Sequence, residues 1–283
     1  MLFLAQVTLS YSAADTACHT LYTNQKDCDA DSGCTWCLCG ALPSACWTIA
    51  NSHKLPPTVY ECDKKMAPSN TTQSPITLLT FDGSATDHKW QHMDDPVMGG
   101  QSKSTFEVED GVGKFAGTCA IVPFLKAPGF CKVTTQRGLF TPAKFPDASA
   151  FIDGSLYLTV KSSSPAYKGF KVDFGAKGLK RPTGSVSHGS ASLKADFELP
   201  AGAATDFVTV KIPFSSFSVD WSDYTGECDT KDPGGYQHLC CDTEHPEVCP
   251  QAHHLAKIES FAMWAEGVAG DFELEIKEIA AGP

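Results

Sequence analysis

Short segments that alternate apolar and polar residues fill the chain from residue 76 to its end. A period of two is typical of half-buried β-strands, and the Gly and Pro between the segments are typical of turns. No window shows the period of an amphipathic helix of ordinary length. This spacing predicts an all-β sandwich or barrel. The predicted strands are 76–81, 114–121, 130–134, 156–161, 170–174, 193–197, 207–212, 257–264 and 272–276.

An irregular stretch, WQHMDDPVMGGQSKSTF at 90–106, interrupts this pattern. Its composition is too irregular for a helix or a strand and is good turn chemistry. Pro96 fixes its own φ and pushes Asp95 towards an extended conformation. Gly99 and Gly100 permit positive φ or a close backbone approach. We therefore expect a structured loop that leads into a strand.

The same stretch resembles a known family. The string DPVMGGQS at 95–102, preceded by Trp90, is similar to the signature loop of the complex I intermediate-associated protein 30 family, and the resemblance covers about 76–280. It implies a galactose-binding-like jelly-roll β-sandwich, and an assembly or accessory factor of large membrane complexes rather than a catalyst. The downstream matches are FAG at 115–117, GF at 129–130, LYLTVK at 156–161, VKIPFSSF at 210–217 and GDFELEI at 270–276.

Seven of the 13 Cys lie in a short N-terminal segment. This density is typical of small domains that disulfides stabilise in an oxidising compartment. Because the total is odd, at least one Cys is free, pairs between chains, or lost its partner with an incomplete N-terminus. The candidate disulfide residues of this segment are Cys18, Cys28, Cys34, Cys37, Cys39, Cys46 and Cys62.

Within this segment, DSGCTWC at 31–37 resembles the G-C-x-W-C core of plexin-semaphorin-integrin modules, although a common upstream Cys pair is missing. Such modules are small disulfide knots that position neighbouring domains. Cys34 and Cys37 also have the spacing of zinc ligands. Only His19 and His53 lie nearby, so we favour disulfides over zinc.

Six further Cys lie in the predicted β-domain. Cys119 and Cys131 are near facing ends of predicted strands, which makes a cross-strand disulfide plausible. The other four lie in a stretch at about 218–254 that the family pattern replaces with a shorter connection, so we expect a disulfide-tied insertion specific to this protein or subgroup. Zinc is the alternative, because four His lie among these Cys, but their spacing fits no standard zinc finger. The Cys of the insertion are Cys228, Cys240, Cys241 and Cys249, and the His are His238, His245, His253 and His254.

The chain is therefore expected to have four parts: a signal-sequence remnant at 1–14, a Cys-rich module at 15–65, a linker at 66–75 and the β-sandwich at 76–283. The first part is mostly apolar but short, and the sequence has no Lys or Arg before Lys26. No other stretch approaches the roughly 18 apolar residues of a membrane span. Asn70 begins a glycosylation sequon.

Composition and motifs exclude several functions. A formal net charge of −11 and a pI near 5.2 argue against nucleic acid or anionic lipid as the main partner. The adjacent Asp94 and Asp95 would point to opposite faces of an extended run, a poor start for paired-carboxylate chemistry. G-x-S-x-G, H-E-x-x-H and Gly-rich phosphate loops are absent from the sequence. We therefore expect that the protein is not an enzyme and that it binds no cofactor and no metal.

Two kinds of binding remain. In the first, the chain is a non-catalytic accessory factor that binds protein partners, with a large membrane complex as the candidate. The 90–102 loop then displays Met93, Val97 and Met98 as an adaptable apolar patch. In the alternative, it is a secreted or lumenal carbohydrate-binding protein, and one of two sets supplies the aromatic platform and polar groups: Trp90, Asp94 and Asp95, or Trp221, Asp223 and Tyr224. More often, a Trp in such a set packs in the core and an Asp stabilises a turn. The candidate partner- or ligand-binding residues are Trp90, Asp94, Asp95, Met98, Gly99, Gly100, Ser102, Trp221, Asp223 and Tyr224.

The compartment follows from the Cys content. The family members that the sandwich resembles work in mitochondria or chloroplasts, where the matrix and stroma are mostly reducing. The Cys density instead predicts an oxidising compartment, either the secretory and extracellular route or an organelle lumen such as that of thylakoids.

Overall fold

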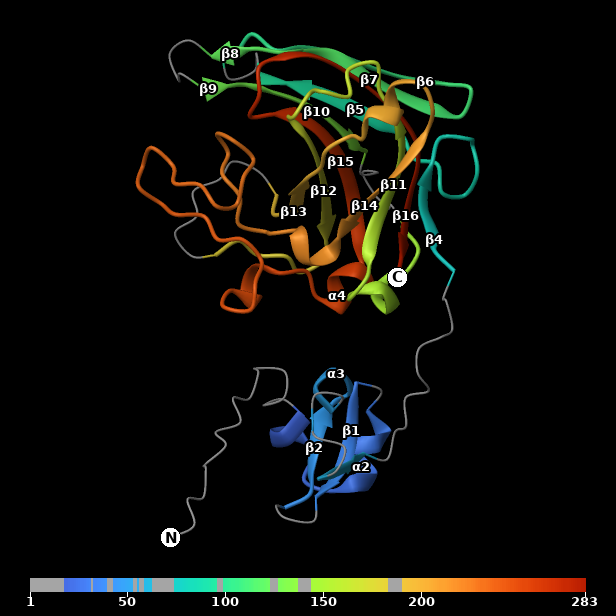
Figure 1. Ribbon diagram of the computed structural model, residues 1–283, viewed down its shortest axis with the longest axis vertical. Coiled ribbons are helices and arrows are strands. Elements are labelled where there is room, and N and C mark those ends of the chain that lie inside the picture. Colours follow the sequence, from blue (N-terminus) through green and yellow to red (C-terminus); the bar gives the residue numbers. More distant parts are fainter. Residues whose placement is uncertain are drawn as a thin grey trace. The chain divides into compact units, whose positions relative to one another are not determined.

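The computed structural model describes residues 18–31, 33–39, 43–52, 55, 59–62, 74–95, 99–122, 127–136, 144–182 and 190–283 (Figure 1). The chain divides into two compact units, Met1–Thr72 and Gln73–Pro283. Asn70 and Met98 lie outside the described residues. In the part of the chain that the structure describes, no helix is long and apolar enough to cross a membrane.

The N-terminal unit is a small disulfide-bonded knot. Its three strands pair antiparallel in the order β2-β1-β3, and Asn24 caps the preceding helix by accepting a hydrogen bond from the backbone N–H of Asp27. The disulfides are Cys18–Cys34, Cys28–Cys46 and Cys37–Cys62. The elements are α2 (Gln25–Ala30), β1 (Cys34–Cys39), β2 (Ala45–Thr48), α3 (Ile49–Ser52) and β3 (Tyr60–Cys62).

Cys39 was expected among the disulfides, but it is a free, half-buried thiol. The reason lies in the strand register. On the β1–β3 pair, Cys37 stands opposite Cys62, while Cys39 stands opposite Tyr60. Cys39 therefore has no Cys opposite it and is the one Cys of this segment that the three disulfides leave over.

The larger unit is an antiparallel two-sheet sandwich of the jelly-roll kind, which confirms the predicted all-β fold. One sheet has the order β14-β11-β16-β7-β6, with β4 added on β16, and the other has the order β13-β12-β15-β10-β5. The strands are β4 (Ile76–Thr80), β5 (Trp90–Asp94), β6 (Lys103–Glu109), β7 (Val112–Cys119), β10 (Phe130–Thr135), β11 (Ser155–Lys161), β12 (Phe170–Ala176), β13 (Leu193–Asp196), β14 (Val208–Pro213), β15 (Ile258–Glu266) and β16 (Gly270–Gly282).

Short elements complete this unit. A two-stranded ribbon pairs β8 (Ile121–Val122) with β9 (Ala127–Pro128). The remaining helices are single turns, namely η2 (Ser149–Phe151), η3 (Ala201–Ala204), η4 (Phe214–Ser216), η5 (Pro246–Val248) and α4 (Ala252–Leu255).

A single apolar core fills the space between the two sheets. Every second residue of a strand points into it, as the sequence alternation predicts. In β11, for example, Leu156, Leu158 and Val160 are completely buried, and Phe261 and Met263 of β15 face them from the other sheet. The opposite face of each strand is therefore left for polar residues.

Residues 90–94, expected to be irregular, form an edge strand. β5 pairs antiparallel with β10, so that Trp90 stands opposite Thr135 and Asp94 opposite Cys131. The Gly and Pro residues that suggested a loop all follow Asp95, and the five residues before them are free to extend.

Cys119 and Cys131, for which a disulfide was plausible, are free and buried thiols. β7 and β10 belong to different sheets, so the two residues are not cross-strand neighbours. Each thiol instead donates a hydrogen bond to a backbone carbonyl, Cys119 to Gly129 at 3.0 Å and Cys131 to Thr118 at 3.8 Å. Burial raises the pKa of Cys119 to about 11 and raises that of Cys131 further.

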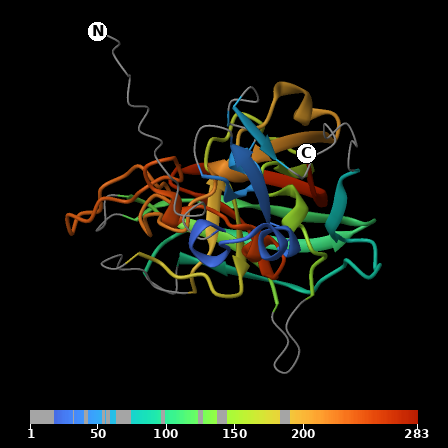
Figure 2. The same cartoon turned by 90° about the horizontal axis from the view of Figure 1, so that it is seen from below.

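The insertion at 218–254 projects from the β13 side of the sandwich in both views (Figure 1, Figure 2). Its four Cys form Cys228–Cys240 and Cys241–Cys249, so none of them is available to zinc. Both ring nitrogens of the buried His238 are also engaged. Nδ1 lies 2.8 Å from Asp220 Oδ1, and Nε2 lies 2.9 Å from Asp232 Oδ2.

Candidate binding site

The carboxylate of Asp95 is the centre of the 95–102 loop. Asp95 is only 3% exposed, and it accepts hydrogen bonds from the backbone N–H and the hydroxyl of Ser102 at 2.8 and 2.9 Å. A third, longer bond of 3.3 Å comes from the backbone N–H of Phe130. Asp95 thus ties the loop to the start of β10. A buried carboxylate needs such donors, because losing water without them is costly.

The glycines of the loop make room for this carboxylate. A Cβ added at Gly100 would lie 2.1 Å from Cγ of Asp95, and one added at Gly129 would lie 1.3 Å from its Oδ2. Gly99 has a φ of 85°, which L side chains rarely adopt. In the DPVMGGQS string, Ser102 therefore supplies donors to the buried carboxylate of Asp95, and Gly100 leaves the space that this carboxylate fills.

Asp94 and Trp90 also serve the fold. Asp94 accepts hydrogen bonds from the backbone N–H and hydroxyl of Ser104, at 2.7 and 2.5 Å, which joins β5 to β6. Trp90 packs against the core, with ring centroids 5.5 Å from Phe81 and 5.3 Å from Phe106. The sugar-binding set predicted from Trp90, Asp94 and Asp95 is thus engaged in packing.

The second predicted set borders a real pocket. Trp221 is 5% exposed and donates its indole N–H to the backbone carbonyl of Ser192 at 2.9 Å. Asp223 Oδ1 lies 3.8 Å from Nη1 of Arg181, and Tyr224 is partly exposed. Of these three, only Trp221 lines the pocket itself.

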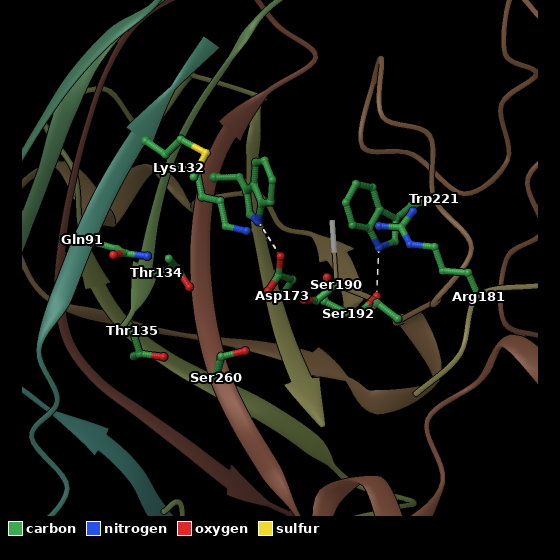
Figure 3. A pocket seen from close by; sticks show the side chains of 13 residues that line it. Gln91, Lys132, Thr134, Thr135, Asp173, Arg181, Ser190, Ser192, Trp221 and Ser260 are labelled. Atoms are coloured by element: carbon green, nitrogen blue, oxygen red, sulfur yellow. Dashed lines mark hydrogen bonds between the residues drawn. The ribbon is translucent and has the colours of Figure 1, made fainter. Parts of the chain in front are cut away.

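This pocket lies on the face of the five-stranded sheet that points away from the core, and its volume is about 360 Å³ (Figure 3). Strand register brings its residues together. One row across the sheet carries Met93, Lys132 and Trp264, and the next carries Gln91, Thr134 and Asp173. Ser260 of β15 and residues 190–192, before β13, complete the polar lining.

Buried charges support the pocket on its insertion side. The ammonium group of Lys194 lies 3.6 Å from the ring centroids of both Trp221 and Trp264. It also donates a hydrogen bond of 2.6 Å to Oε2 of Glu266. Nearby, Lys171 pairs with Glu227 of the insertion. These contacts hold the two indoles against the buried ion pair.

Polar groups also orient the pocket floor. Trp264 donates its indole N–H to Oδ2 of Asp173 at 2.7 Å. Lys132 and Arg181 each place a cation over an indole, 4.2 Å from the ring centroid of Trp264 and 4.3 Å from that of Trp221. Both aromatic faces are therefore covered by cations, and a ligand would meet charge and hydrogen-bonding groups before it met an open ring.

The sequence did not predict Lys132, Asp173, Arg181 or Trp264 as site residues. A signal was present, since the polar residues of 130–135 and 170–176 alternate with core residues and so must share a face. Which strands lie side by side, however, is set by the sheet order. The pocket lining is mostly polar, with the charged side chains of Lys132, Asp173 and Arg181.

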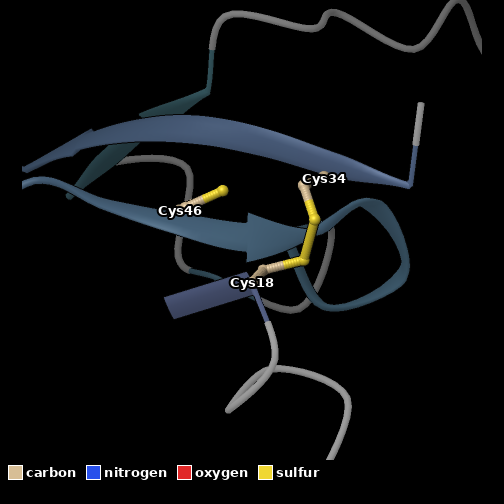
Figure 4. A group of neighbouring side chains, drawn as sticks. All are labelled: Cys18, Cys34 and Cys46. Carbon is tan, nitrogen blue, oxygen red and sulfur yellow. A yellow bond between two sulfur atoms is a disulfide. The ribbon is translucent and has the colours of Figure 1, made fainter. Parts of the chain in front are cut away.

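Three sulfurs of the N-terminal unit, those of Cys18, Cys34 and Cys46, lie within 4.8 Å of one another and resemble a metal site (Figure 4). All three atoms are already bonded, because Cys18 pairs with Cys34 and Cys46 pairs with Cys28. A disulfide sulfur carries no thiolate, which is the form that binds zinc. Cys34 and Cys37 likewise belong to different disulfides, so the zinc alternative fails for this pair.

The family model of Complex I intermediate-associated protein 30 (CIA30) matches residues 79–233. The chain belongs to this family. The match begins in β4 and ends inside the insertion, so it includes the Asp95 loop and most of the pocket. No curated protein matches this CIA30-family chain.

Solved structures share the sandwich at low identity. The solution structure of CtCBM11 is 14% identical, covers 76% of this chain and 98% of its own, and has a TM-score of 0.41. The family 11 carbohydrate-binding module of the cellulosomal cellulase Lic26A-Cel5E of Clostridium thermocellum is 14% identical, with coverages of 74% and 95% and a TM-score of 0.40. The agarase AgWH50C is 9% identical, with coverages of 75% and 25% and a TM-score of 0.41. Similarity at this level assigns no ligand to the CIA30-family chain.

Proposed function

We propose that this CIA30-family chain is a non-catalytic accessory factor that binds protein partners of a larger, membrane-associated complex through its β-sandwich. The observation that carries the proposal is the family match over 79–233, which is more than half of the chain. Membership of this family supports an assembly role. The five disulfides indicate an oxidising compartment, and we propose the secretory route or an organelle lumen as the place of action.

The edge strand β5 is the surface that we propose for the partner. It ends the five-stranded sheet, and an edge strand offers unpaired backbone groups to a strand of another chain. Gln91, His92 and Met93 are exposed along it, and Met93 is 44% exposed. A flexible thioether beside a free backbone edge suits an adaptable protein contact. Asp94 and Asp95 hold this edge in place rather than touching the partner.

The test is native-gel migration of the endogenous protein after mild detergent lysis, with mass spectrometry of its band. We expect it to co-migrate with a large complex. Met93→Lys should abolish co-migration, whereas Val268→Lys, a similarly exposed apolar residue between β15 and β16, should preserve it. Migration of the unaltered protein at about its own mass of 30.3 kDa would contradict the proposal.

Carbohydrate binding is a second candidate, and the pocket beside Trp221 and Trp264 favours it. Small-ligand sites are concave and hold a few convergent polar groups, and here Gln91, Ser190 and Ser260 line a pocket whose indole faces are covered by cations. A protein interface would place aromatic and aliphatic residues at its centre and charges at its rim, whereas this pocket has charges at its centre.

A further inference from the structure

Arg181 carries unused hydrogen-bonding capacity inside the pocket. Its side chain is 10% exposed, and among the described residues Nε and Nη1 have no hydrogen-bond partner. The nearest carboxylate oxygen, Oδ1 of Asp223, is 3.8 Å from Nη1, which is too long for a hydrogen bond. Buried donors without a partner are rare in folded proteins, because each one loses its hydrogen bonds to water.

Arg181 lines the pocket with its guanidinium over an indole ring. Its guanidinium carbon lies 4.3 Å from the ring centroid of Trp221. Stacking uses the face of a guanidinium, and its five N–H groups point outward in the plane. Burial lowers the pKa of Arg181, while the carboxylates of Asp223, Asp173 and Asp220 act in the opposite direction. The group stays protonated, and an additional anion would offset its loss of water.

Lys132 supplies a second cation. Its ammonium lies over Trp264, and no carboxylate of the described residues lies within salt-bridge distance of it. The pocket lining thus holds Lys132 and Arg181 against one acid, Asp173, in a chain whose formal net charge is −11. Figure 3 shows Lys132 and Arg181 on opposite sides of Asp173. Glu266 neutralises the neighbouring Lys194, and Asp223 lies 3.8 Å from Arg181, so Lys132 is the lining cation that has no carboxylate of the described residues within salt-bridge distance.

Neutral donors and acceptors surround the two cations. The side chains of Gln91, Ser190 and Ser260 make no hydrogen bond to described residues, and they line the same pocket. Short hydroxyl and amide groups suit a ligand with many hydroxyls of its own. The cations require in addition that this ligand carry negative charge.

We propose that this pocket binds an acidic saccharide, whose carboxylates or sulfates pair with Arg181 and Lys132 while its hydroxyls bind Gln91, Ser190 and Ser260. The inference rests on the second candidate function. It shares Gln91 and Met93 with the protein contact proposed along β5, whereas Arg181 and Lys132 belong to the pocket alone. Carboxylate and sulfate are both planar or tetrahedral arrays of oxygens that a guanidinium can bind through paired N–H groups.

The experiment is calorimetric titration of the full chain with oligogalacturonides and with their methyl esters of the same length, which remove the charge and keep the sugar. A sulfated galactan oligosaccharide distinguishes sulfate from carboxylate. We expect the acid to bind at least about tenfold more tightly than the ester, and Arg181→Gln to remove most of this preference. Lys132→Gln should weaken it as well, and Lys168→Gln, at an exposed ion pair outside the pocket, should not.

Because Arg181 also packs on Trp221, its variant is compared with the unaltered protein by circular dichroism and melting, and Lys132→Gln gives an independent reading. Equal binding of acid and ester, unaffected by either variant, would overturn the inference and leave carbohydrate binding intact. Failure to bind any of the saccharides would overturn both. Arg181-dependent binding of a Glu-rich peptide in place of the saccharides would overturn the ligand class.

Discussion

The ammonium of Lys194 donates a hydrogen bond of 2.6 Å to Glu266, and the two side chains are 0% and 3% exposed. They form a buried ion pair on the face of the sheet that points away from the main core. The indoles of Trp221 and Trp264 close over it, so the pair and the rings form one unit. Removing one partner would leave the other charge buried and unpaired.

Lys194→Met is therefore expected to lower the free energy of unfolding by about 3–5 kcal/mol, because Glu266 keeps its charge without a partner. Chemical denaturation followed by fluorescence measures this change. Lys168→Met is the matched control, since Lys168 pairs with Glu198 at 2.7 Å but both are about half exposed or more. That variant should change stability by less than about 1 kcal/mol. Equal effects of the two variants would contradict the expected role of burial.

Gly129→Ala should lower the free energy of unfolding by about 1–3 kcal/mol, because its new Cβ would overlap the carboxylate of Asp95. Thermal melting checks the change. Gly234→Ala, where no atom lies within 4 Å of the added Cβ, is the control and should stay within about 0.5 kcal/mol of the unaltered protein. Gly100→Val should displace the 95–102 loop without unfolding the sandwich, and amide NMR shifts confined to that region would show this.

The Asp95 loop and the Lys194–Glu266 pair show which features could be predicted from the sequence and which could not. That Gly100 needs a bare backbone could be predicted from its neighbours in the sequence. The reason is the Asp95 carboxylate, and its packing also depends on Gly129, which lies just before β10. The strands themselves were predicted well, since a period of two is a local signal. Lys194 and Glu266 are 72 residues apart, and only the order β13-β12-β15 brings them together. Pairing of that kind leaves no local trace in the sequence.

Thiol labelling tests the pairing of the 13 Cys, all of which the structure describes. Iodoacetamide under native, non-reducing conditions is expected to modify Cys39 alone, because it is partly exposed. Cys119 and Cys131 should react only after denaturation, since burial keeps them away from the reagent and raises their pKa. Peptide mapping by mass spectrometry identifies the sites. A Cys119–Cys131 disulfide in the map would contradict the structure.

The pH dependence of stability should include a contribution from His254. Burial and the neighbouring His253 lower the pKa of His254 to about 4, from 6.5. Its Nδ1 accepts a hydrogen bond from the backbone N–H of Gln251 at 3.1 Å, which protonation would remove. Because the folded-state pKa is depressed, this contribution is fully present above pH 6.5 and is lost as the pH falls towards 4.

Urea denaturation between pH 7 and pH 4 measures this contribution. We expect the unaltered protein to lose stability across the window with a slope from His254 of at most about 1.4 kcal/mol per pH unit. His254→Asn keeps an acceptor near the same place without a titrating ring, so it should lose less. The exposed His92→Asn is the control and should follow the unaltered protein. Parallel curves for all three proteins would rule out this role for His254.

The segment that carries Trp221 contacts a loop that a disulfide closes, whereas the two sheets of the sandwich contain no disulfide among the described residues. Trp221 is followed by Ser222, whose hydroxyl bonds at 2.5 Å to Asp232, inside the loop that Cys228–Cys240 closes. The sheets, by contrast, pack around free thiols. If this chain matured without oxidation, it would therefore keep its β-sandwich, but the loop that contains Asp232 would no longer be closed by Cys228–Cys240. The redox history of each molecule, and not its sequence alone, would then decide how firmly the loop behind Trp221 is held, while Lys194 and Ser192 would still hold the indole itself.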